Sequence, residues 1–345
     1  MLDTDTAKSD GRSSVPLSIK ASGKTDKGLV RAGNEDYLHI DEDNLVFAVC
    51  DGMGGHQAGE VASMTAAETI LKSFSHFRHD LLEDGSLGVP KDLPPSGDVL
   101  VKSIRLANRA IYNMALEDSG LSGMGTTVVA VAFESDIMSI AHVGDSRAYR
   151  LREKDLEPLT RDHSWVAEIQ ESQNLTAEEA SSVVGKNVIT RALGVRDTVE
   201  VDYRIEKVEP GEIILLCSDG LCGFADDYEI YDVAAKHRSD LSKMVDDLIQ
   251  MANDRGGSDN VTVIALQVEA IESSPLPPVE AYTVDEENET ESAAEDGWLD
   301  QYSRLSSHTA AAANDPPSKG PSATLLVAIF AVFAIVAVLI IWLQS

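Results

Sequence analysis

The sequence is poor in cysteine, in aromatic residues and in basic residues. Its three cysteines, Cys50, Cys217 and Cys222, form no even set and lack zinc-ligand spacing, so we expect neither a disulfide framework nor a zinc site. Cys50 and Cys217 lie in apolar runs, where a free cysteine is usually a core residue. Only 28 Lys and Arg oppose 58 Asp and Glu, and the net charge of −30 argues against a nucleic acid partner, because nucleic acids are bound by clustered basic side chains.

The N-terminus lacks the apolar segment of a signal peptide: residues 1–13 are polar, and we expect them to be disordered. The hydrophobic fraction of 43% and the charged fraction of 25% are nevertheless those of a globular protein, at a length that allows one or two domains. The excess of acidic residues has two possible explanations: it keeps the protein soluble, or some of the carboxylates are gathered to hold divalent cations.

The C-terminal part of the chain differs in composition from the rest. Residues 270–322 are acidic and rich in proline and serine, which predicts a flexible linker. Residues 323–343 are 21 uncharged residues, and as a helix they would span about 30 Å, the hydrocarbon thickness of a bilayer. We therefore expect one C-terminal transmembrane helix. Because only Gln344 and Ser345 follow it, we expect the preceding domain on the cytoplasmic side of the inner (plasma) membrane.

Residues 14–269 remain as one domain of catalytic size, without an internal repeat. Apolar runs bounded by turn residues predict strands at 45–50, 127–133, 138–143, 148–151, 213–217 and 261–268. Amphipathic patterns predict helices at 60–74, 99–116, 165–170, 177–183, 227–235 and 241–253. Hairpin-type strands with helices grouped in pairs favour an α+β fold, with antiparallel sheets covered by helices.

Four carboxylates stand at the ends of predicted strands. Asp51, Asp145 and Asp219 each follow an apolar strand beside a glycine, and Asp259 precedes the last predicted strand. Taken singly, each of these aspartates could simply belong to a turn, where aspartate and glycine are common. Four of them would converge if the sheets bring one end of each strand together, and converging like charges need a cation or shifted pKa values. All-oxygen ligands favour Mg²⁺, Mn²⁺ or Ca²⁺ over zinc.

An arginine and a glutamate four residues apart precede the first of these strand ends. Arg31 could grip a phosphate bidentately while Glu35 faces a metal, although Arg31 alone could equally form a surface salt bridge with Glu35 or Asp36. The glycine-rich turn that begins at Asp51 allows backbone carbonyls to approach a cation. It matches neither the phosphate-binding loop of nucleotide hydrolases nor a dinucleotide fingerprint.

Eight short motifs in this chain resemble, in order, those of metal-dependent Ser/Thr protein phosphatases of the 2C type, and bacterial members most closely. They are RAGNED (31–36), DGMGGHQAGE (51–60), GMGTT (123–127), HVGDSR (142–147), LTRDHS (159–164), ITRALG (189–194), SDGL (218–221) and DNVTV (259–263). The resemblance covers roughly residues 18–268. It implies a four-layer αββα fold, in which a β-sandwich of two antiparallel sheets is flanked by helix pairs and holds the metal centre at one end.

The resemblance also implies the metal ligands. Asp51 would bridge two ions, either Mn²⁺ or Mg²⁺. Asp219 and Asp259 would complete the first metal site, while Glu35 and the backbone carbonyl of Gly52 would belong to the second.

Further roles follow from the same resemblance, with two departures. Asp145, together with Asp219, would hold a third and weaker metal, and Arg31 would bind the substrate phosphate. Gly223 stands where the family often has an acidic residue, which bears on the third metal alone. Met53 stands where eukaryotic relatives have a candidate general acid, so the general acid is left unassigned.

The implied function is hydrolysis of phosphoserine and phosphothreonine on proteins, by attack of a water that bridges two metal ions. The expected partners are phosphorylated proteins, among them a Ser/Thr protein kinase and its substrates. Residues 165–187 would form a mobile flap that influences substrate choice. The alternative is a non-catalytic, membrane-anchored module that binds phosphoproteins. Loss of a metal carboxylate would favour that alternative, and none of the core carboxylates is lost.

Overall fold

The structure, a computed structural model of the whole chain, describes residues 17–55, 57–81, 94–173, 175–176, 179, 188–271 and 282–283. All of these belong to the first of two compact units, Met1–Glu291. The fold below is that of this unit.

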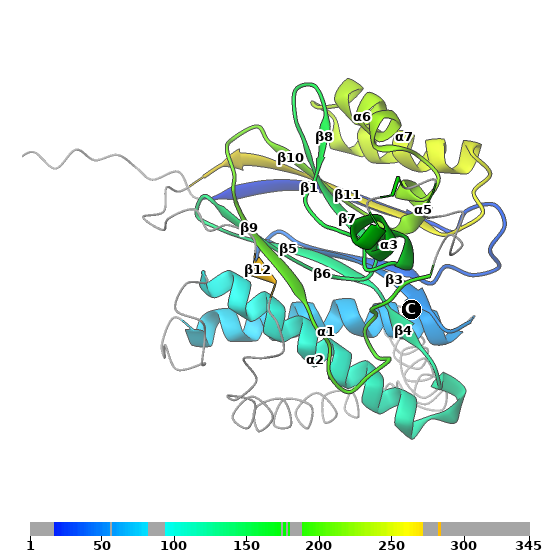
Figure 1. Cartoon of the computed structure of the whole chain (residues 1–345). Coiled ribbons are helices and arrows are strands. Elements are labelled where there is room, and N and C mark those ends of the chain that lie inside the picture. Colours follow the sequence, from blue (N-terminus) through cyan, green and yellow to red (C-terminus); the bar gives the residue numbers. More distant parts are fainter. Residues whose placement is uncertain are drawn as a thin grey trace, which may run out of the picture. The chain divides into compact units, whose positions relative to one another are not determined.

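Two antiparallel sheets form the centre of the unit (Figure 1). The five-stranded sheet has the order β1 (Ser18–Asp26), β11 (Val261–Ala270), β10 (Ile213–Cys217), β7 (Arg147–Leu151) and β8 (Leu156–Pro158). The seven-stranded sheet has the order β12 (Tyr282–Thr283), β9 (Asp202–Lys207), β6 (Ile137–Val143), β5 (Val128–Glu134), β3 (Val46–Met53) and β2 (Asp36–Asp41), with β4 (Gly125–Thr126) paired to β3.

Helices cover the outer faces of both sheets, which gives four layers (Figure 1). The helices α1 (Gln57–Leu81) and α2 (Pro95–Glu117) pack together on the seven-stranded sheet. The helices α6 (Asp227–Lys236) and α7 (Leu241–Asp254) pack on the five-stranded sheet. Among the described residues, the short helices η1 (Ser119–Leu121), α3 (Trp165–Gln173) and α5 (Asp219–Cys222) lie in the connections.

Strand β10 shows why the central strands are apolar throughout. Successive side chains of a strand face opposite sides of its sheet. Ile214 and Leu216 pack into the core between the two sheets, whereas Ile213, Leu215 and Cys217 pack under α6 and α7. Both faces of the strand are therefore covered, and the continuous apolar run replaces the alternation of a half-exposed strand.

The predicted sandwich of two antiparallel sheets with helices is confirmed. Two predicted cysteine placements are also confirmed, because Cys50 and Cys217 are buried free thiols. In the described part of the chain, no helix is long and apolar enough to cross a membrane. The predicted span at 323–343 lies outside the described residues, as do most of the predicted helix at 177–183 and of the predicted linker.

Candidate metal centre

Asp51 lies near the end of β3, with its backbone held on one side by two threonines. Its carbonyl accepts hydrogen bonds from the amide of Thr127 (2.8 Å) and from the hydroxyl of Thr126 (2.9 Å). Its amide donates to the Thr127 hydroxyl (3.1 Å). Because every one of these bonds involves the main chain of Asp51, the backbone from which its carboxylate projects is fixed.

Glycines bring Glu35 against the end of β3. The amide of Gly52 donates to the carbonyl of Glu35 at 3.1 Å. A Cβ atom added at Gly52 would lie 2.1 Å from the carbonyl oxygen of Gly59, and one added at Gly59 would lie 2.8 Å from the carboxyl carbon of Glu35. Glycine is therefore required at both positions for the Glu35 carboxylate and the Gly52 backbone to approach each other.

The other sheet supplies two further carboxylates. Asp219 begins α5, two residues after the end of β10, and Asp259 comes two residues before β11. The guanidinium of Arg31 donates from Nη2 to Oδ2 of Asp259 at 2.8 Å. The loop between β1 and β2 therefore reaches the start of β11, and the salt-bridge partner of Arg31 is Asp259, not Glu35 or Asp36.

A buried carboxylate, Asp36, joins the two sheets beside this cluster. It lies opposite Asp51 in the β2–β3 register. Its Oδ2 accepts hydrogen bonds from the hydroxyls of Ser218 and Thr262, both at 2.7 Å. Burial raises the pKa of Asp36 to about 7, although the two hydroxyl groups oppose this shift. The contact fixes the residue before Asp219 relative to β2.

The carboxylates of the cluster disfavour one another's charge. The pKa of Asp51 is raised well above its usual range by burial and then by the charges of Asp36, Asp219 and Asp145. Burial and the charge of Asp259 raise the pKa of Asp219, and burial and Asp219 raise the pKa of Asp145 to about 7. A divalent cation among these oxygens would remove the repulsion, and an all-oxygen donor set suits Mg²⁺ or Mn²⁺. The residues present therefore fit a metal centre.

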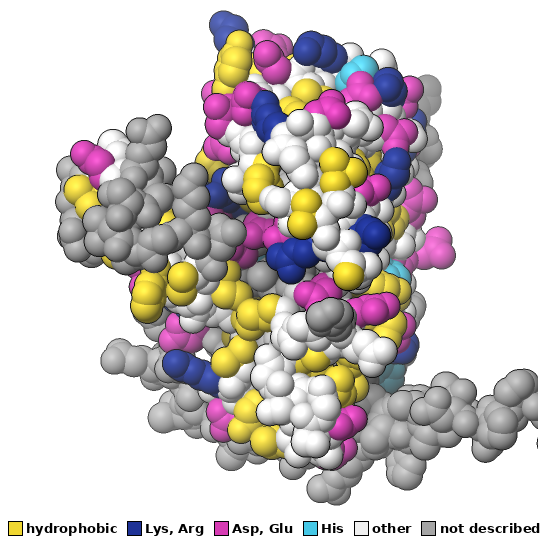
Figure 2. Space-filling model, turned by 90° about the vertical axis from the view of Figure 1, so that its right-hand side faces the viewer, with side chains coloured by type: hydrophobic (Ala, Val, Ile, Leu, Met, Phe, Trp, Pro, Cys, Tyr) yellow, Lys and Arg dark blue, Asp and Glu magenta, His cyan; other side chains and the backbone are white. Residues whose placement is uncertain are grey.

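The end of the sandwich that carries α3, α5 and β4 in Figure 1 faces the viewer in Figure 2. Near the centre of that face, Asp and Glu side chains lie beside Lys and Arg side chains, with hydrophobic side chains scattered around them. A mixed surface of this kind can receive an anionic group at its basic side chains while acidic side chains hold cations.

Comparison with known proteins decides the family. Residues 30–265 match the family model of protein phosphatase 2C. The chain belongs to the protein phosphatase 2C family. The Serine/threonine phosphatase stp of Listeria welshimeri is 37% identical over 252 residues, which are 72% of this chain and 96% of that protein. The Serine/threonine protein phosphatase PstP of Mycobacterium tuberculosis is 34% identical over 257 residues, which are 74% of this chain and 46% of that protein.

Solved structures of the protein phosphatase 2C family agree with the fold. The catalytic domain of a phosphatase named PstP, in complex with two manganese ions, is 33% identical and has a TM-score of 0.61. The match covers 73% of this chain and 99% of that one. Protein phosphatases 2C are metal-dependent, and the matched residues 30–265 include Arg31 and every predicted metal ligand.

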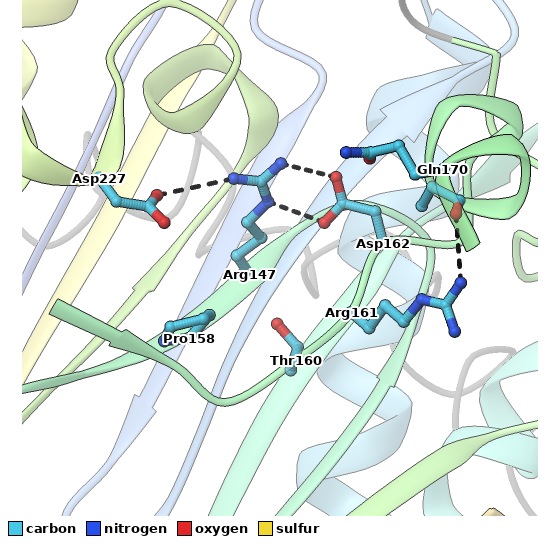
Figure 3. A pocket seen from close by; sticks show the side chains of 8 residues that line it. Arg147, Pro158, Thr160, Arg161, Asp162, Gln170 and Asp227 are labelled. Carbon is cyan, nitrogen blue, oxygen red and sulfur yellow. Dashed lines mark hydrogen bonds and ion pairs between the residues drawn. The ribbon is translucent and has the colours of Figure 1, made fainter. Parts of the chain in front are cut away.

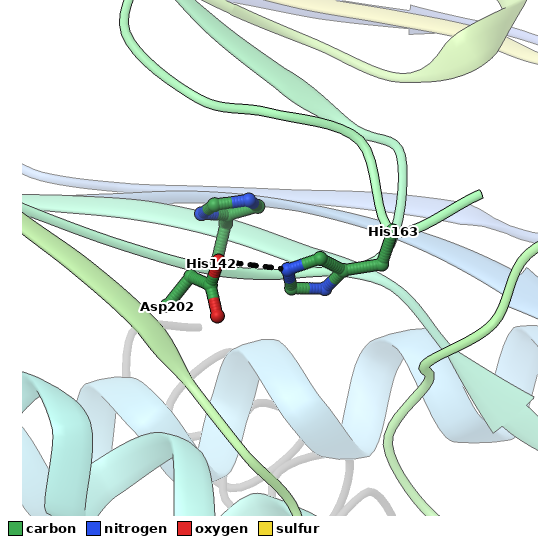
Figure 4. Close-up of side chains that lie close together, drawn as sticks. All are labelled: His142, His163 and Asp202. Carbon is green, nitrogen blue, oxygen red and sulfur yellow. Dashed lines mark ion pairs between the residues drawn. The ribbon is translucent and has the colours of Figure 1, made fainter. Parts of the chain in front are cut away.

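A second cluster of possible ligands lies elsewhere in this protein phosphatase 2C domain (Figure 4). The rings of His142 and His163 stack with centroids 4.7 Å apart. Nδ1 of His163 accepts from the amide of Gly144 at 3.1 Å, and its Nε2 lies 3.2 Å from Oδ2 of Asp202. Nε2 of His142 donates to the carbonyl of Arg161 at 2.7 Å. Both ring nitrogens of His163 are thus used by protein groups.

We interpret this histidine cluster as a support for the strand ends. Burial, followed by the neighbouring His163, lowers the pKa of His142 to about 4, so this ring is neutral at pH 7. A metal would have to displace existing hydrogen bonds to bind here. Both histidines stand in motifs that the sequence displayed, but their stacking depends on tertiary structure, so sequence reasoning did not select them.

A pocket of about 680 Å³ in the phosphatase domain is lined by residues of β7, β8, α3 and α6 and of the segment between β8 and α3 (Figure 3). At its centre, Nε and Nη2 of Arg147 donate to the two carboxylate oxygens of Asp162, both at 2.7 Å, and Asp227 lies on the other side of the guanidinium. The pKa of Asp145 is raised by burial and by neighbouring carboxylates, Asp162 among them. The pocket therefore lies within electrostatic range of the predicted third metal site.

The structure brings the predicted site residues together from both sheets. They are Arg31, Glu35, Asp51, Gly52, Asp145, Asp219 and Asp259. Their roles as metal ligands and as a phosphate-binding residue stay predictions. Of the predicted flap, the structure describes α3, residues 175–176 and residue 179, while the rest of it lies outside the described residues.

Proposed function

We propose that this chain is a metal-dependent protein phosphatase that hydrolyses phosphoserine and phosphothreonine on proteins. The observation that carries this conclusion is the convergence of five carboxylates and one arginine at one end of the sandwich. Family membership supports it, and relatives at 34% and 37% identity are named serine/threonine phosphatases.

We assign two Mn²⁺ or Mg²⁺ ions to the carboxylate cluster. Asp51 would bridge them, Asp219 and Asp259 would complete the first site, and Glu35 and the Gly52 carbonyl would hold the second. When bound, such ions lower the pKa of a water molecule and neutralise the charge of a phosphoryl group. A third and weaker site is assigned to Asp145 together with Asp219, whose charges already interact.

Arg31 is the residue of this chain that we expect to bind the substrate phosphate. Its side chain is 48% exposed, and one of its nitrogens is held by Asp259, so the guanidinium is both accessible and oriented. Arginine suits this role because its planar group presents several N–H donors to phosphate oxygens. Ser218, next to Asp219, is buried and donates to Asp36, so we give it a structural role and not that of a nucleophile.

The test is Mn²⁺-dependent hydrolysis of a phosphothreonine peptide by the full chain in mild detergent. We expect the wild-type protein to be active and Asp51→Ala to lose both activity and Mn²⁺ binding, because the proposed bridging ligand is gone. The matched control is Asp43→Ala, which removes an exposed carboxylate from the β2–β3 turn. Equal inactivity of the wild type and Asp51→Ala would contradict the enzyme function. Absence of Mn²⁺ binding below millimolar concentrations would instead favour the non-catalytic phosphoprotein-binding module.

We further propose that residues 323–343 anchor the protein in the inner (plasma) membrane, with residues 270–322 as a linker and residues 14–269 as a cytoplasmic domain. The support is the uncharged 21-residue run in the sequence. Protease added to intact cells should leave the catalytic domain undigested, and should digest it after the cells are lysed. Digestion in intact cells would reverse the orientation, and recovery of the protein in the soluble fraction would contradict the anchor.

The proposed physiological partner is a Ser/Thr protein kinase together with its phosphorylated substrates. The support is the reaction itself, since a phosphatase needs a kinase to supply its substrate. Comparison of phosphorylated proteins in cells with and without this gene would test the proposal. Phosphothreonine and phosphoserine sites that rise only when the gene is absent are the expected result.

A further inference from the structure

The loop that joins β1 to β2, residues 27–35, carries the predicted phosphate-binding arginine and one predicted metal ligand, yet it has little apolar support. Leu29 and Val30 are 71% and 69% exposed, and residues 31–33 are exposed as well. Apolar burial therefore contributes little to holding this stretch in place. Its position depends on polar contacts with the residues that precede β11.

Asn260 makes three of these contacts with one buried side chain, which is 4% exposed. Its Oδ1 accepts from the amide of Glu35 at 2.8 Å. Its Nδ2 donates to the carbonyls of Lys27 and Gly33, both at 2.9 Å. The side-chain amide therefore uses both of its N–H donors and an acceptor, and its partners stand at the two ends of the loop.

Backbone contacts hold the middle of the same loop. The carbonyl of Gly257 accepts from the amides of Leu29 (2.7 Å) and Val30 (3.2 Å). Gly28 has a φ of +76°, and a Cβ atom added there would lie 2.2 Å from the carbonyl oxygen of Asp259. The loop thus lies directly against residues 257–260, the segment that contains Asn260.

We propose that Asn260 is a positioning residue that clamps loop 27–35 and thereby places Arg31 and Glu35 relative to Asp259. The inference rests on the proposed function and extends it to a residue that is assigned neither metal nor phosphate. Asn260 directly follows Asp259, and its amide donates to Oδ1 of that carboxylate at 2.9 Å. One short segment therefore supplies a ligand, orients it and fixes the loop that carries its partners.

The test compares Asn260→Ala with wild type in the full chain, by amide hydrogen exchange and by kinetics. The amides of Leu29 and Val30 bond to Gly257 and not to Asn260, so faster exchange there, by on the order of tenfold or more, reports release of the whole loop. We also expect Mn²⁺ affinity and kcat/KM for a phosphothreonine peptide each to fall about 10- to 100-fold.

The matched control is Asn108→Ala. Asn108 is also a buried asparagine, 1% exposed, and its side chain makes three hydrogen bonds with backbone groups of residues 194–197, which lie outside loop 27–35. Removing these bonds should leave the exchange of Leu29 and Val30 at wild-type values. Wild-type exchange of these two amides in Asn260→Ala would overturn the proposal.

A second variant, Asn260→Asp, separates the donors from the acceptor. It keeps an oxygen for the amide of Glu35 but places another oxygen against the carbonyls of Lys27 and Gly33, so we expect it to behave like Asn260→Ala. Wild-type behaviour of Asn260→Asp would show the proposal to be wrong. Failure of both variants to fold would assign Asn260 to the stability of the whole domain, which also overturns the proposal. An inactive wild type would refute the proposed function, while the exchange result would still decide on the clamp.

Discussion

Gly59 offers a prediction in which stability and activity change in opposite directions. In Gly59→Ala, the new methyl group would lie 2.8 Å from the carboxyl carbon and 3.0 Å from Oε1 of Glu35. Carbon atoms in contact normally lie about 3.5–4.0 Å apart, so the Glu35 carboxylate must move by about 0.7 Å or more. A displacement of about 1 Å at a catalytic group can lower the rate on the order of 100-fold.

The same substitution should change the stability of the folded protein only slightly. Gly59 lies in the first turn of α1, and replacing glycine by alanine in a helix stabilises it by at most about 1 kcal/mol, which is roughly 2–4 °C in Tm for a domain of this size. The end of the Glu35 side chain can rotate away, although the carbonyl carbon of Gly52, 3.0 Å from the added methyl group, limits the relaxation. We therefore expect an unchanged or slightly higher Tm together with a roughly 100-fold lower kcat/KM.

The assay pairs thermal unfolding with phosphothreonine-peptide kinetics over a range of Mn²⁺ concentrations. Gln57→Ala, at the exposed start of the same helix, is the control and should change neither quantity appreciably. Activity of Gly59→Ala within twofold of wild type at limiting Mn²⁺ would refute the reasoning, since Glu35 would then tolerate displacement. A Tm lowered by more than about 5 °C would show that the backbone contact with Gly52 dominates.

Three further predictions concern stability. The folded pKa of His142, about 4, lies below the ordinary value of 6.5, so protons bind the unfolded state preferentially and this group lowers stability as the pH falls from 6.5 to 4. Between pH 7 and pH 5, the free energy of unfolding measured in urea should fall by about 2 kcal/mol less in His142→Gln than in wild type. Equal decreases in the two proteins would contradict a neutral, buried ring. In Gly97→Ala the added methyl group would lie 1.9 Å from the hydroxyl of Tyr203. We therefore expect thermal unfolding to show a stability lower by about 1–3 kcal/mol, with kcat unchanged. An unchanged Tm would contradict this expectation. Mn²⁺ at 100 times its Kd should raise the free energy of unfolding of the EDTA-treated protein by about 2.7 kcal/mol in urea titrations. Identical urea unfolding curves with and without Mn²⁺ would contradict a metal site that exists in the folded state alone.

Strand burial explains which elements could be predicted from the sequence. β10, covered on both faces, is an uninterrupted apolar run, and the predicted bounds 213–217 match Ile213–Cys217. β2 (Asp36–Asp41) is half-exposed and carries three polar residues, Asp36, His39 and Asp41, so its sequence has no strong strand signal. β1 and β9 were missed for the same reason, since polar side chains occupy much of each strand.

The site was predictable as a set of residues but not as a geometry. Asp51, Asp219 and Asp259 were selected because strand ends beside turns are visible in a sequence. The contacts that position them depend on pairings between distant segments. Asp36 reaches Ser218, and Asn260 reaches the carbonyl of Lys27, each across more than 180 residues. No local pattern encodes such contacts, which arise when the two sheets pack together.

The place of β11 has a consequence for how the protein is made. In the five-stranded sheet, β1 and β10 both pair with β11, which is synthesised after them. Until residues 261–270 leave the ribosome, β1 has no partner in that sheet and β10 keeps an open edge, and open edges invite pairing with other chains. The carboxylate of Asp259 arrives with the same segment. A nascent chain that stops before this point is therefore aggregation-prone, and it also lacks one of the proposed metal ligands.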